Sequence, residues 1–335
     1  MAIANAQVDP WIPKLDEETR SAMQRVQPNS LKGHVSFLSS DLLLGRETPS
    51  VGLDLAAEYI AAQFRRAGIE PAAKDGYFQV APWPLEGTPK TKVRNVVGIL
   101  RGSDTFLRET YVLVSAHYDH LGTRAEAKDK VFNGANDNGS GTAGVIELAQ
   151  SLAAMKTRPK RSIVFALWFG EEKGLQGSRY YGKNPLFPID KTVAMINLEQ
   201  IGRTDDADTV RKKALSMTGY DYSDLGPILR ESARATGIEV EKHPVNSDAY
   251  FARSDNQAFA DLGVPAHTVC TTFTYPDYHQ AGDEWEKLDY DNMAAVLKGV
   301  LVGLVTLSDT IQEPRWNAKN PKAERYAAAR AARKR

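Results

Sequence analysis

YVLVSAHYDHLG, residues 111–122, begins as an apolar run rich in β-branched residues and ends in a polar cluster and a glycine. Such a run, bounded by polar residues, is typical of a buried strand. A second run of this kind, SIVFALWF at 162–169, leads into Gly170 and two glutamates. Because open α/β sheets bind ligands beyond the carboxyl ends of their strands, the two stretches predict a site at one edge of a parallel sheet.

Strand and helix patterns alternate along the chain from Lys92 onward. The other predicted strands are 93–100, 192–198, 213–218 and 265–271. Helical spacing of apolar residues occurs at 15–26, 52–68, 141–155, 175–182, 222–237, 255–263 and 290–311. The proline-rich stretch 80–89 is irregular or an edge segment. This alternation implies an α/β fold with a largely parallel sheet covered on both faces.

The composition is that of an ordinary soluble globular enzyme, with 42% hydrophobic and 25% charged residues among 335. The formal net charge is zero, so no global field favours nucleic acid or an anionic membrane. No apolar run reaches about 18 residues, so we expect no membrane span. The single cysteine, Cys270, excludes an internal disulfide and a cysteine-based metal site, and it fits a small core hydrophobe.

The two ends of the chain suggest little about chemistry. Ala4-Asn5-Ala6 resembles the small-residue end of an export signal, so we expect a secreted or periplasmic protein, with a cytoplasmic location left open. The segment KAERYAAARAARKR (322–335) is rich in Ala and Arg and nearly devoid of acids. We expect it to be a solvated, frayed helix.

His117 and Asp119 are two residues apart at the end of a predicted strand, so their side chains leave the same face. This arrangement suits one metal ligand and one carboxylate that fixes the tautomer of the bound imidazole. His120 follows immediately and is expected to point elsewhere, as a hydrogen-bonded structural histidine.

Carboxylates at two predicted turns extend the cluster. Asp137 lies in a Gly/Asn-rich turn before a helix, and its two oxygens can bridge two metals about 3.5–4 Å apart. Glu171 and Glu172 are adjacent after the second apolar run, where two free carboxylates facing one cavity would repel each other. The repulsion is relieved when one binds a cation and the other acts as a base. We therefore assign Glu172 to metal binding and Glu171 to general base catalysis.

Glu199 ends the apolar run 192–198, and His279 lies in a loop before the last helix. The predicted ligands are His117, Asp137 and Glu199 for one ion, and Asp137, Glu172 and His279 for the other. Three protein ligands per ion leave an open position for water, as catalytic zinc requires. Imidazole and carboxylate without thiolate suit zinc, with cobalt or manganese as substitutes. The pattern indicates a metal-dependent hydrolase.

Six blocks of the sequence together resemble the co-catalytic zinc aminopeptidase family. That family includes bacterial leucine-type aminopeptidases, and its relatives include glutamate carboxypeptidase II and glutaminyl cyclase. The blocks are SAHYDHLG (115–122), NGANDNGSGTAG (133–144), EEKGLQGSRYY (171–181), INLEQIGR (196–203), RSDNQAFADLGVPA (253–266) and DYHQAGDEW (277–285). The resemblance implies a three-layer α/β/α sandwich with a mixed, mostly parallel central sheet, as in zinc exopeptidases.

The resemblance also implies residue roles. Two zinc ions would be held by the five ligands His117, Asp137, Glu172, Glu199 and His279. Glu171 would be the general base toward a metal-bridged water, Asp119 would support His117, and the hydroxyl of Tyr278 would steady the oxyanion. The peptide bond between Asp137 and Asn138 would be cis. The implied activity is that of an aminopeptidase acting on peptides with a free N-terminus.

In domain terms, we expect an N-terminal helical extension at 1–30, a single catalytic domain at 31–312 and a basic tail at 313–335. Only about a dozen residues separate Asp104 from Ala116, so no inserted protease-associated domain is expected. One departure from the family is Glu199, where Asp is usual. The extra methylene changes the reach of the carboxylate by roughly 1.5 Å and bears on ion affinity or choice.

Other readings of the same core remain open. A dipeptidase or carboxypeptidase uses the same constellation, and a glutaminyl-cyclase-like acyltransferase works with one zinc. Metal stoichiometry and ammonia release from an N-terminal glutamine peptide would distinguish this acyltransferase from an exopeptidase. Arg203, Arg253 and Asp255 lie near the motif segments and are candidates for meeting a substrate terminus, although salt bridges and helix capping explain them equally well. The sequence leaves the oligomeric state and the preferred side chain open.

Overall fold

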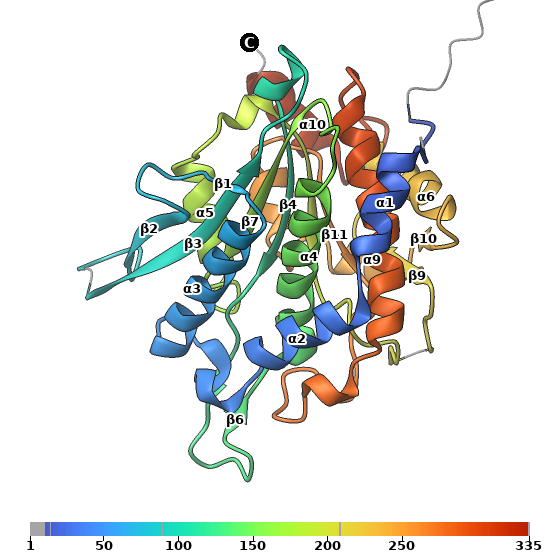
Figure 1. Cartoon of the computed structure of the whole chain (residues 1–335). Coiled ribbons are helices and arrows are strands. Elements are labelled where there is room, and N and C mark those ends of the chain that lie inside the picture. The colour runs from blue at the N-terminus through green and yellow to red at the C-terminus, as the bar shows by residue number, and fades with distance from the viewer. Residues whose placement is uncertain (1–10, 14, 89, 208, 334–335) are drawn as a thin grey trace, which may run out of the picture.

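Figure 1 shows the computed structural model of the chain, which describes residues 11–333 except residues 14, 89 and 208. A central sheet is covered by helices on both faces, which is the three-layer α/β/α arrangement expected from the sequence. The predicted export-signal remnant at 4–6 lies outside the described residues.

The main sheet contains nine strands in the described part of the chain. They are β1 (Glu70–Pro71), β2 (Phe78–Trp83), β3 (Thr91–Leu100), β4 (Tyr111–His117), β7 (Ser162–Trp168), β8 (Thr192–Leu198), β9 (Ala214–Met217), β10 (Glu239–Glu241) and β11 (Ala266–Cys270). Their order is β1-β3-β7-β4-β8-β11-β9-β10, with β2 also pairing with β3 as an edge strand. A separate small sheet joins β5 (Gly122–Thr123) and β6 (Val131–Phe132).

The four central strands β7, β4, β8 and β11 run parallel, whereas β3 joins β7 and β9 joins β11 in antiparallel fashion. Each residue of β4 is buried, since the strand has neighbours on both sides and helices on both faces. This explains why its sequence is continuously apolar rather than alternating. Val112 and Val114 face one hydrophobic cluster, and Tyr111 and Leu113 face the other.

Two sets of helices cover the sheet. One face packs against α1 (Glu17–Arg25), α2 (Pro28–Leu38), α3 (Val51–Arg66), α4 (Gly141–Ala153), α6 (Leu225–Arg234) and α9 (Tyr290–Asp309). The other packs against α5 (Gln176–Lys183), α8 (Asn256–Ala260) and α10 (Glu324–Arg333), while α7 (Asn246–Ala249) is a single turn. Shorter helical turns are η1 (Asp41–Arg46), η2 (Leu107–Glu109), η3 (Ala135–Ser140), η4 (Ile189–Lys191), η5 (Tyr220–Tyr222) and η6 (Trp285–Lys287).

The longest helix, α9, is apolar on most of its surface because it lies inside the protein. Among the described residues it is the one helix whose length and hydropathy would suffice to cross a membrane, but 83% of its most apolar window is buried. Gly299 and Gly303 allow close approach to Ala233 and Leu229 of α6, where an added Cβ would meet neighbouring atoms at 3.0 and 2.4 Å. These features are those of a core helix.

Two parts of the chain differ from the sequence-based expectation. Helix α2 was not predicted, and the domain boundary expected at residue 30 falls within it. The prediction of a solvated, frayed tail was wrong, because Tyr326 is only 3% exposed and stacks on Trp316 with ring centroids 5.0 Å apart. Arg330 of the same helix donates to the carbonyl of Thr192 and pairs with Glu313. These aromatic rings attach the tail to the sheet.

Candidate metal centre

The carboxyl ends of three neighbouring parallel strands form the floor of the site. His117 is the last residue of β4, Glu171 and Glu172 follow β7, and Glu199 follows β8 directly. Since β7, β4 and β8 are adjacent and parallel, these side chains emerge at the same edge of the sheet. Asp137 joins them from the turn η3 that leads into α4.

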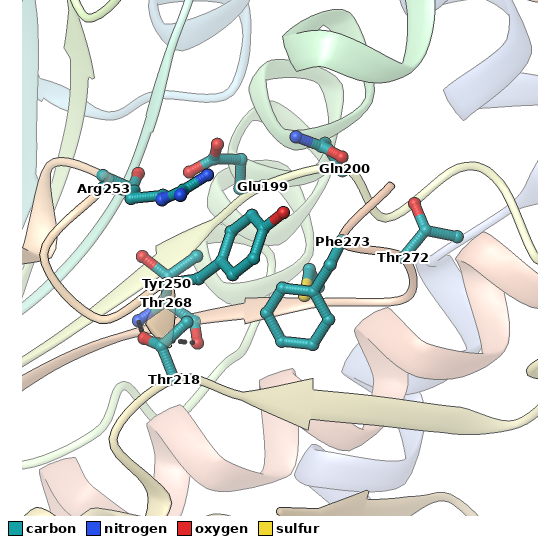
Figure 2. A pocket seen from close by; sticks show the side chains of 10 residues that line it. Glu199, Gln200, Thr218, Tyr250, Arg253, Thr268, Thr272 and Phe273 are labelled. Atoms are coloured by element: carbon teal, nitrogen blue, oxygen red, sulfur yellow. Dashed lines mark hydrogen bonds between the residues drawn. The ribbon is translucent and has the colours of Figure 1, made fainter. Parts of the chain in front are cut away.

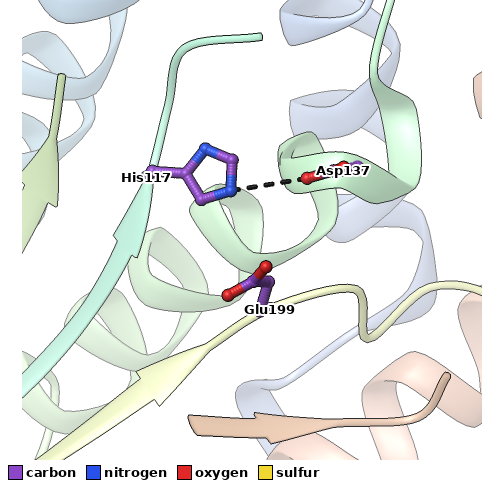
Figure 3. A group of neighbouring side chains, drawn as sticks. All are labelled: His117, Asp137 and Glu199. Carbon is purple, nitrogen blue, oxygen red and sulfur yellow. Dashed lines mark ion pairs between the residues drawn. The ribbon is translucent and has the colours of Figure 1, made fainter. Parts of the chain in front are cut away.

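His117, Asp137 and Glu199 converge, with one ligand atom from each residue lying within 4.8 Å of the others. Figure 3 shows the imidazole of His117 facing the carboxylate of Asp137, with Glu199 on the next strand end. His117 Nε2 lies 3.4 Å from Asp137 Oδ1. His117 Nε2 and Glu199 Oε2 are buried and have no hydrogen-bond partner within the described residues. Buried polar atoms of this kind require a partner, and a cation between them would supply one.

The second oxygen of Asp137 serves a different set of side chains. His279 Nε2 lies 3.1 Å from Asp137 Oδ2 and 3.5 Å from Glu172 Oε1. One carboxylate therefore faces His117 with one oxygen and His279 with the other. The peptide bond that follows it, Asp137-Asn138, is cis as the sequence resemblance implied.

The expectation that His120 points away from the site was wrong. Its Nδ1 lies 3.0 Å from Glu172 Oε1, and His120, Asp137 and Glu172 form a second group of ligand atoms within 4.8 Å of one another. The His120 and His279 rings meet edge to face, 5.8 Å apart. Strand alternation does not extend to this residue, because β4 ends at His117 and the chain turns, so that His120 N–H donates to the carbonyl of Arg46.

Asp119 lies behind His117, on the side away from Asp137. Its Oδ1 is 3.5 Å from His117 Nδ1, and the same oxygen accepts a hydrogen bond from the backbone N–H of Glu171. Its other oxygen accepts from the hydroxyl of Thr48. Asp119 is thus placed to orient the imidazole of His117 and to position the start of the Glu171-Glu172 turn.

The turn that carries Asp137 is held by three neighbouring polar side chains. Asp283 accepts hydrogen bonds from the backbone N–H groups of Asn136 and Asp137. Asn136 Oδ1 accepts from the N–H groups of Gly202 and Arg203, and Asn138 Nδ2 donates to the carbonyl of Leu198. The two asparagines therefore connect the turn to the segment after β8 and keep Asp137 and Glu199 in a defined relative position.

The donor set fits divalent metal ions. Imidazole nitrogens and carboxylate oxygens without thiolate are the ligands expected for zinc in a hydrolytic site. The orphaned nitrogen of His117 and the orphaned oxygen of Glu199 lie in the first group, and the buried Nε2 of His120 has no hydrogen-bond partner within the described residues either. The arrangement can hold cations beside a free carboxylate, that of Glu171.

Comparison with known protein families gives a match over residues 95–303 to the model described as peptidase family M28. This range is more than half of the 335-residue chain. The chain belongs to peptidase family M28. Its membership confirms the sequence-based prediction of a zinc metallopeptidase.

Individual relatives of this M28 peptidase are distant. A probable zinc metalloprotease of Leptosphaeria maculans is 26% identical, over 90% of this chain and 79% of the relative. The uncharacterized Escherichia coli protein YfbL is 25% identical, over 87% of this chain and 91% of its own length. Among solved structures, the LapA aminopeptidase of Legionella pneumophila has a TM-score of 0.70 at 18% identity, covering 93% and 78% of the two chains. An aminopeptidase from Aneurinibacillus sp. strain AM-1 has a TM-score of 0.64 at 16% identity, covering 87% and 96%. The structural likeness confirms the predicted fold class.

The electrostatics of the M28 site divide its acids into two kinds. Burial raises the pKa of Glu171 well above its usual range. The charge of His117 lowers this pKa, whereas the nearby carboxylates of Glu199 and Asp255 raise it further. Burial likewise raises the pKa of Glu199 to about 7. Glu172 is different: burial and Asp137 oppose its ionisation, but hydrogen bonds with His120 and His279 lower its pKa to about 2. The protein groups around Glu171 and Glu199 thus do not supply enough positive charge to favour the ionised carboxylates. Bound cations would supply that charge.

An open cleft of about 390 Å³ gives access to these residues. All but two of the predicted catalytic and ligating residues border this cleft: Asp137, Glu171, Glu172, Glu199, Tyr278 and His279. The two exceptions, His117 and Asp119, are buried beneath it. Tyr278 stacks on His279 with ring centroids 4.0 Å apart. Burial and the surrounding carboxylates raise the pKa of the Tyr278 hydroxyl, so it stays protonated and can donate a hydrogen bond.

Sequence reasoning missed two residues beneath the site. Arg46 is 1% exposed, and its guanidinium donates to the carbonyls of Tyr118, Asn133 and Gly134, which border the His117 and Asp137 segments. Burial lowers the pKa of Arg46 to about 10, so it remains charged at neutral pH. Arg46 stands in no pattern that would distinguish it from a surface residue, and Asp283 lies in the block 277–285 but was given no role there.

Proposed function

We propose that this protein is an aminopeptidase that uses two zinc ions to remove N-terminal residues from peptides. The observation that carries the proposal is the position of Asp137, whose Oδ1 faces His117 at 3.4 Å and whose Oδ2 faces His279 at 3.1 Å. A carboxylate shared in this way is how two-metal hydrolases hold ions about 3.5–4 Å apart. The aminopeptidases of Legionella pneumophila and Aneurinibacillus sp. that share this fold support the choice of activity.

His117, Asp137 and Glu199 would hold one ion, and Asp137, Glu172 and His279 the other. When bound, the two ions act as Lewis acids toward the scissile carbonyl and the attacking water. His120, through its contact with Glu172, keeps that carboxylate ionised and oriented toward the second ion. Asp119 fixes His117 with its Nε2 turned toward Asp137.

Glu171 carries the proton transfers in the proposed reaction. Its carboxylate accepts a proton from the attacking water as the water oxygen bonds to the carbonyl carbon. It then donates that proton to the amide nitrogen as the carbon–nitrogen bond breaks and the new N-terminal amine leaves. Tyr278 donates a hydrogen bond to the carbonyl oxygen while that oxygen carries negative charge. General acid–base help of this kind is typically worth about 10²–10⁴-fold in rate.

The experiment that tests the proposal is hydrolysis of a panel of aminoacyl p-nitroanilides and of their N-acetylated counterparts, with and without a chelator. We expect cleavage of the free amines alone, loss of activity on chelation and recovery with zinc at two ions per chain. Cleavage of N-blocked peptides from their C-terminal end would instead identify a carboxypeptidase. One bound zinc together with ammonia release from an N-terminal glutamine peptide would identify a cyclase.

A further inference from the structure

Two arginines on the wall of the cleft are not neutralised by a carboxylate in direct contact, although the charge of Arg179 lowers the pKa of the buried Asp255 against the larger effect of burial. Arg179 lies in the first turn of α5, and Arg253 precedes α8; both side chains are exposed and border the cleft that contains Glu171 and Glu199. Neither forms an ion pair with any residue in the described part of the chain. Arg203, in a neighbouring loop, is the contrast: it binds Asp205 at 2.7 Å and Asp277 at 2.8 Å, so it has a structural explanation.

Arg253 is held in place by a row of aromatic rings. Its guanidinium lies 4.3 Å from the ring centroid of Tyr250, whose other neighbour is Phe273 at 5.0 Å, and Phe273 in turn meets His243 at 5.3 Å. Figure 2 shows Tyr250 between Arg253 and Phe273, with Glu199 beside them. The contact with an aromatic face restricts the long side chain without neutralising its charge.

The space next to the Tyr250 and Phe273 rings limits the size of the substrate group that can bind there. Behind Glu199 is an inner pocket, bordered by Tyr250, Arg253, Cys270 and Phe273, with about 30 Å³ of room for water-sized groups. A cavity needs about 10–15 Å³ of such space to hold one water, so this pocket takes only a small group. A larger charged group of the substrate would therefore lie in the open cleft of about 390 Å³, where Arg253 and Arg179 meet it.

We propose that Arg179 and Arg253 together bind a carboxylate of the substrate, so that the preferred substrates are short peptides with a carboxylate within one residue of the scissile bond. This inference rests on the proposed function and adds the substrate class. Guanidinium groups bind carboxylates through paired, charge-assisted hydrogen bonds, which point charges on flexible lysines reproduce poorly. Two sources offer that chemistry: the free C-terminus of a dipeptide and the side chain of an acidic residue beside the bond.

The test measures kcat/KM for alanyl-alanine and for its C-terminal amide, which differ only in the carboxylate. Alanyl-glutamate α-amide and glutamyl-alanine amide, in which only the C-terminal carboxyl is amidated, supply the acidic side chain instead. We expect the wild-type protein to prefer the dipeptide over its amide by at least about tenfold, mainly through KM, as hydrogen bonds to a charged group suggest. In Arg253→Gln and Arg179→Gln this ratio should fall toward unity, and Arg253→Lys should recover part of it.

Arg65→Gln is the matched control, because Arg65 is also an exposed arginine over a tyrosine ring, that of Tyr77, but lies on α3 away from the cleft. Its ratio should equal that of the wild type. A preference for the acidic side chains over the dipeptide assigns the carboxylate to that source and supports the proposal. The proposal is overturned if the wild type prefers none of the carboxylate-bearing peptides over alanyl-alanine amide, or if the variants lose equally on peptides with and without a carboxylate.

Failure of the proposed function would look different. If the wild type cleaves none of these peptides, calorimetric binding of alanyl-alanine and its amide to the zinc-loaded protein replaces the kinetic ratio. Tighter binding of the dipeptide that is lost in Arg253→Gln, but not in Arg65→Gln, supports the carboxylate site even without turnover. Equal binding of dipeptide and amide contradicts it.

Discussion

The Nδ1 atom of His120 lies 3.0 Å from Oε1 of Glu172, so the predicted metal ligand is held by a second histidine that sequence reasoning had placed outside the site. His120 is fully buried. Groups that orient a metal ligand typically contribute about 10–100-fold to metal affinity.

His120→Asn should weaken binding of the ion on the Glu172 side by about 10–100-fold, because Glu172 loses the partner that keeps it ionised and oriented. The affinity of the His117 position for its ion should change little while the Glu172 position is empty. Zinc titration by calorimetry resolves the two steps. His34→Gln, at another buried histidine on α2, is the control for general damage. Identical titration curves for wild type and His120→Asn would show that the contact is not used.

Glu171→Gln should reduce kcat at least about 100-fold while leaving zinc content at the wild-type level, since the amide cannot accept the proton from water. Turnover of a cleavable nitroanilide and metal analysis of the same sample measure both quantities. Glu58→Gln on α3, where Glu58 pairs with Arg94 at the surface, is a carboxylate control outside the cleft. Wild-type turnover in Glu171→Gln would remove it from the mechanism.

Glu199→Asp restores the side chain usual in the resembling family, but we expect it to lower zinc affinity at the His117 position by about tenfold. The backbone on both sides of residue 199 is held by Asn138, which donates to the carbonyl of Leu198 and accepts from the N–H of Gln200. A side chain shorter by roughly 1.5 Å therefore cannot bring its carboxylate to the position that the Glu199 carboxylate occupies. Glu199→Gln keeps the length without the charge and should lose more. Unchanged affinity in Glu199→Asp would mean that the segment shifts to compensate.

Asp283→Asn should destabilise the protein by about 1–3 kcal/mol, because a buried acceptor of two backbone N–H groups is partly replaced by a donor. Zinc affinity should fall as well, since Asp137 loses its support. Denaturant unfolding of the zinc-free and zinc-loaded protein separates the two effects. Tyr275→Phe removes only the hydroxyl that donates to Asp283. Its free energy of unfolding should lie between those of the wild type and Asp283→Asn.

Acid should destabilise the protein through two buried histidines that have no part in the site. Burial lowers the pKa of His34 and of His267 to about 4, whereas the unfolded value is about 6.5. The unfolded chain therefore takes up these protons first: the stability contribution is complete above about pH 6.5 and is lost as the pH falls toward 4. Each residue should cost about 2 kcal/mol between pH 6.5 and 4.5. Denaturant curves at several pH values should show a shallower loss in His267→Gln, and an equal slope would contradict the assignment.

Residues at strand ends were the predictable part of the site. His117, Glu172 and Glu199 follow apolar runs, and the order of parallel strands brings such ends together at one edge. His120 was misplaced because alternation along a strand was extended beyond the end of β4. No local pattern indicates Asp283 or Arg46, since their partners at 136–137 and 133–134 are joined to them only by the folded chain.

The helices at the two ends were harder to predict than the central layers, because the existence of α2 and the burial of the tail helix were both missed. Leu31, His34, Val35 and Leu38 of α2 have helical spacing, but Pro28 and Gly33 masked the pattern. The tail helix is polar by composition, yet one ring, Tyr326, fits between Phe251 and Trp316. Composition describes the average surface of such a segment, whereas a single aromatic contact decides where it packs.

Asp137, which offers one oxygen to each side of the centre, has a thermodynamic consequence if both positions are filled. An ion that draws on one oxygen changes the charge and orientation of the other, so occupancy at either position alters affinity at its neighbour by the same factor. Loading becomes a cooperative event instead of two independent equilibria, and the half-filled protein is a distinct species with its own preference among ions.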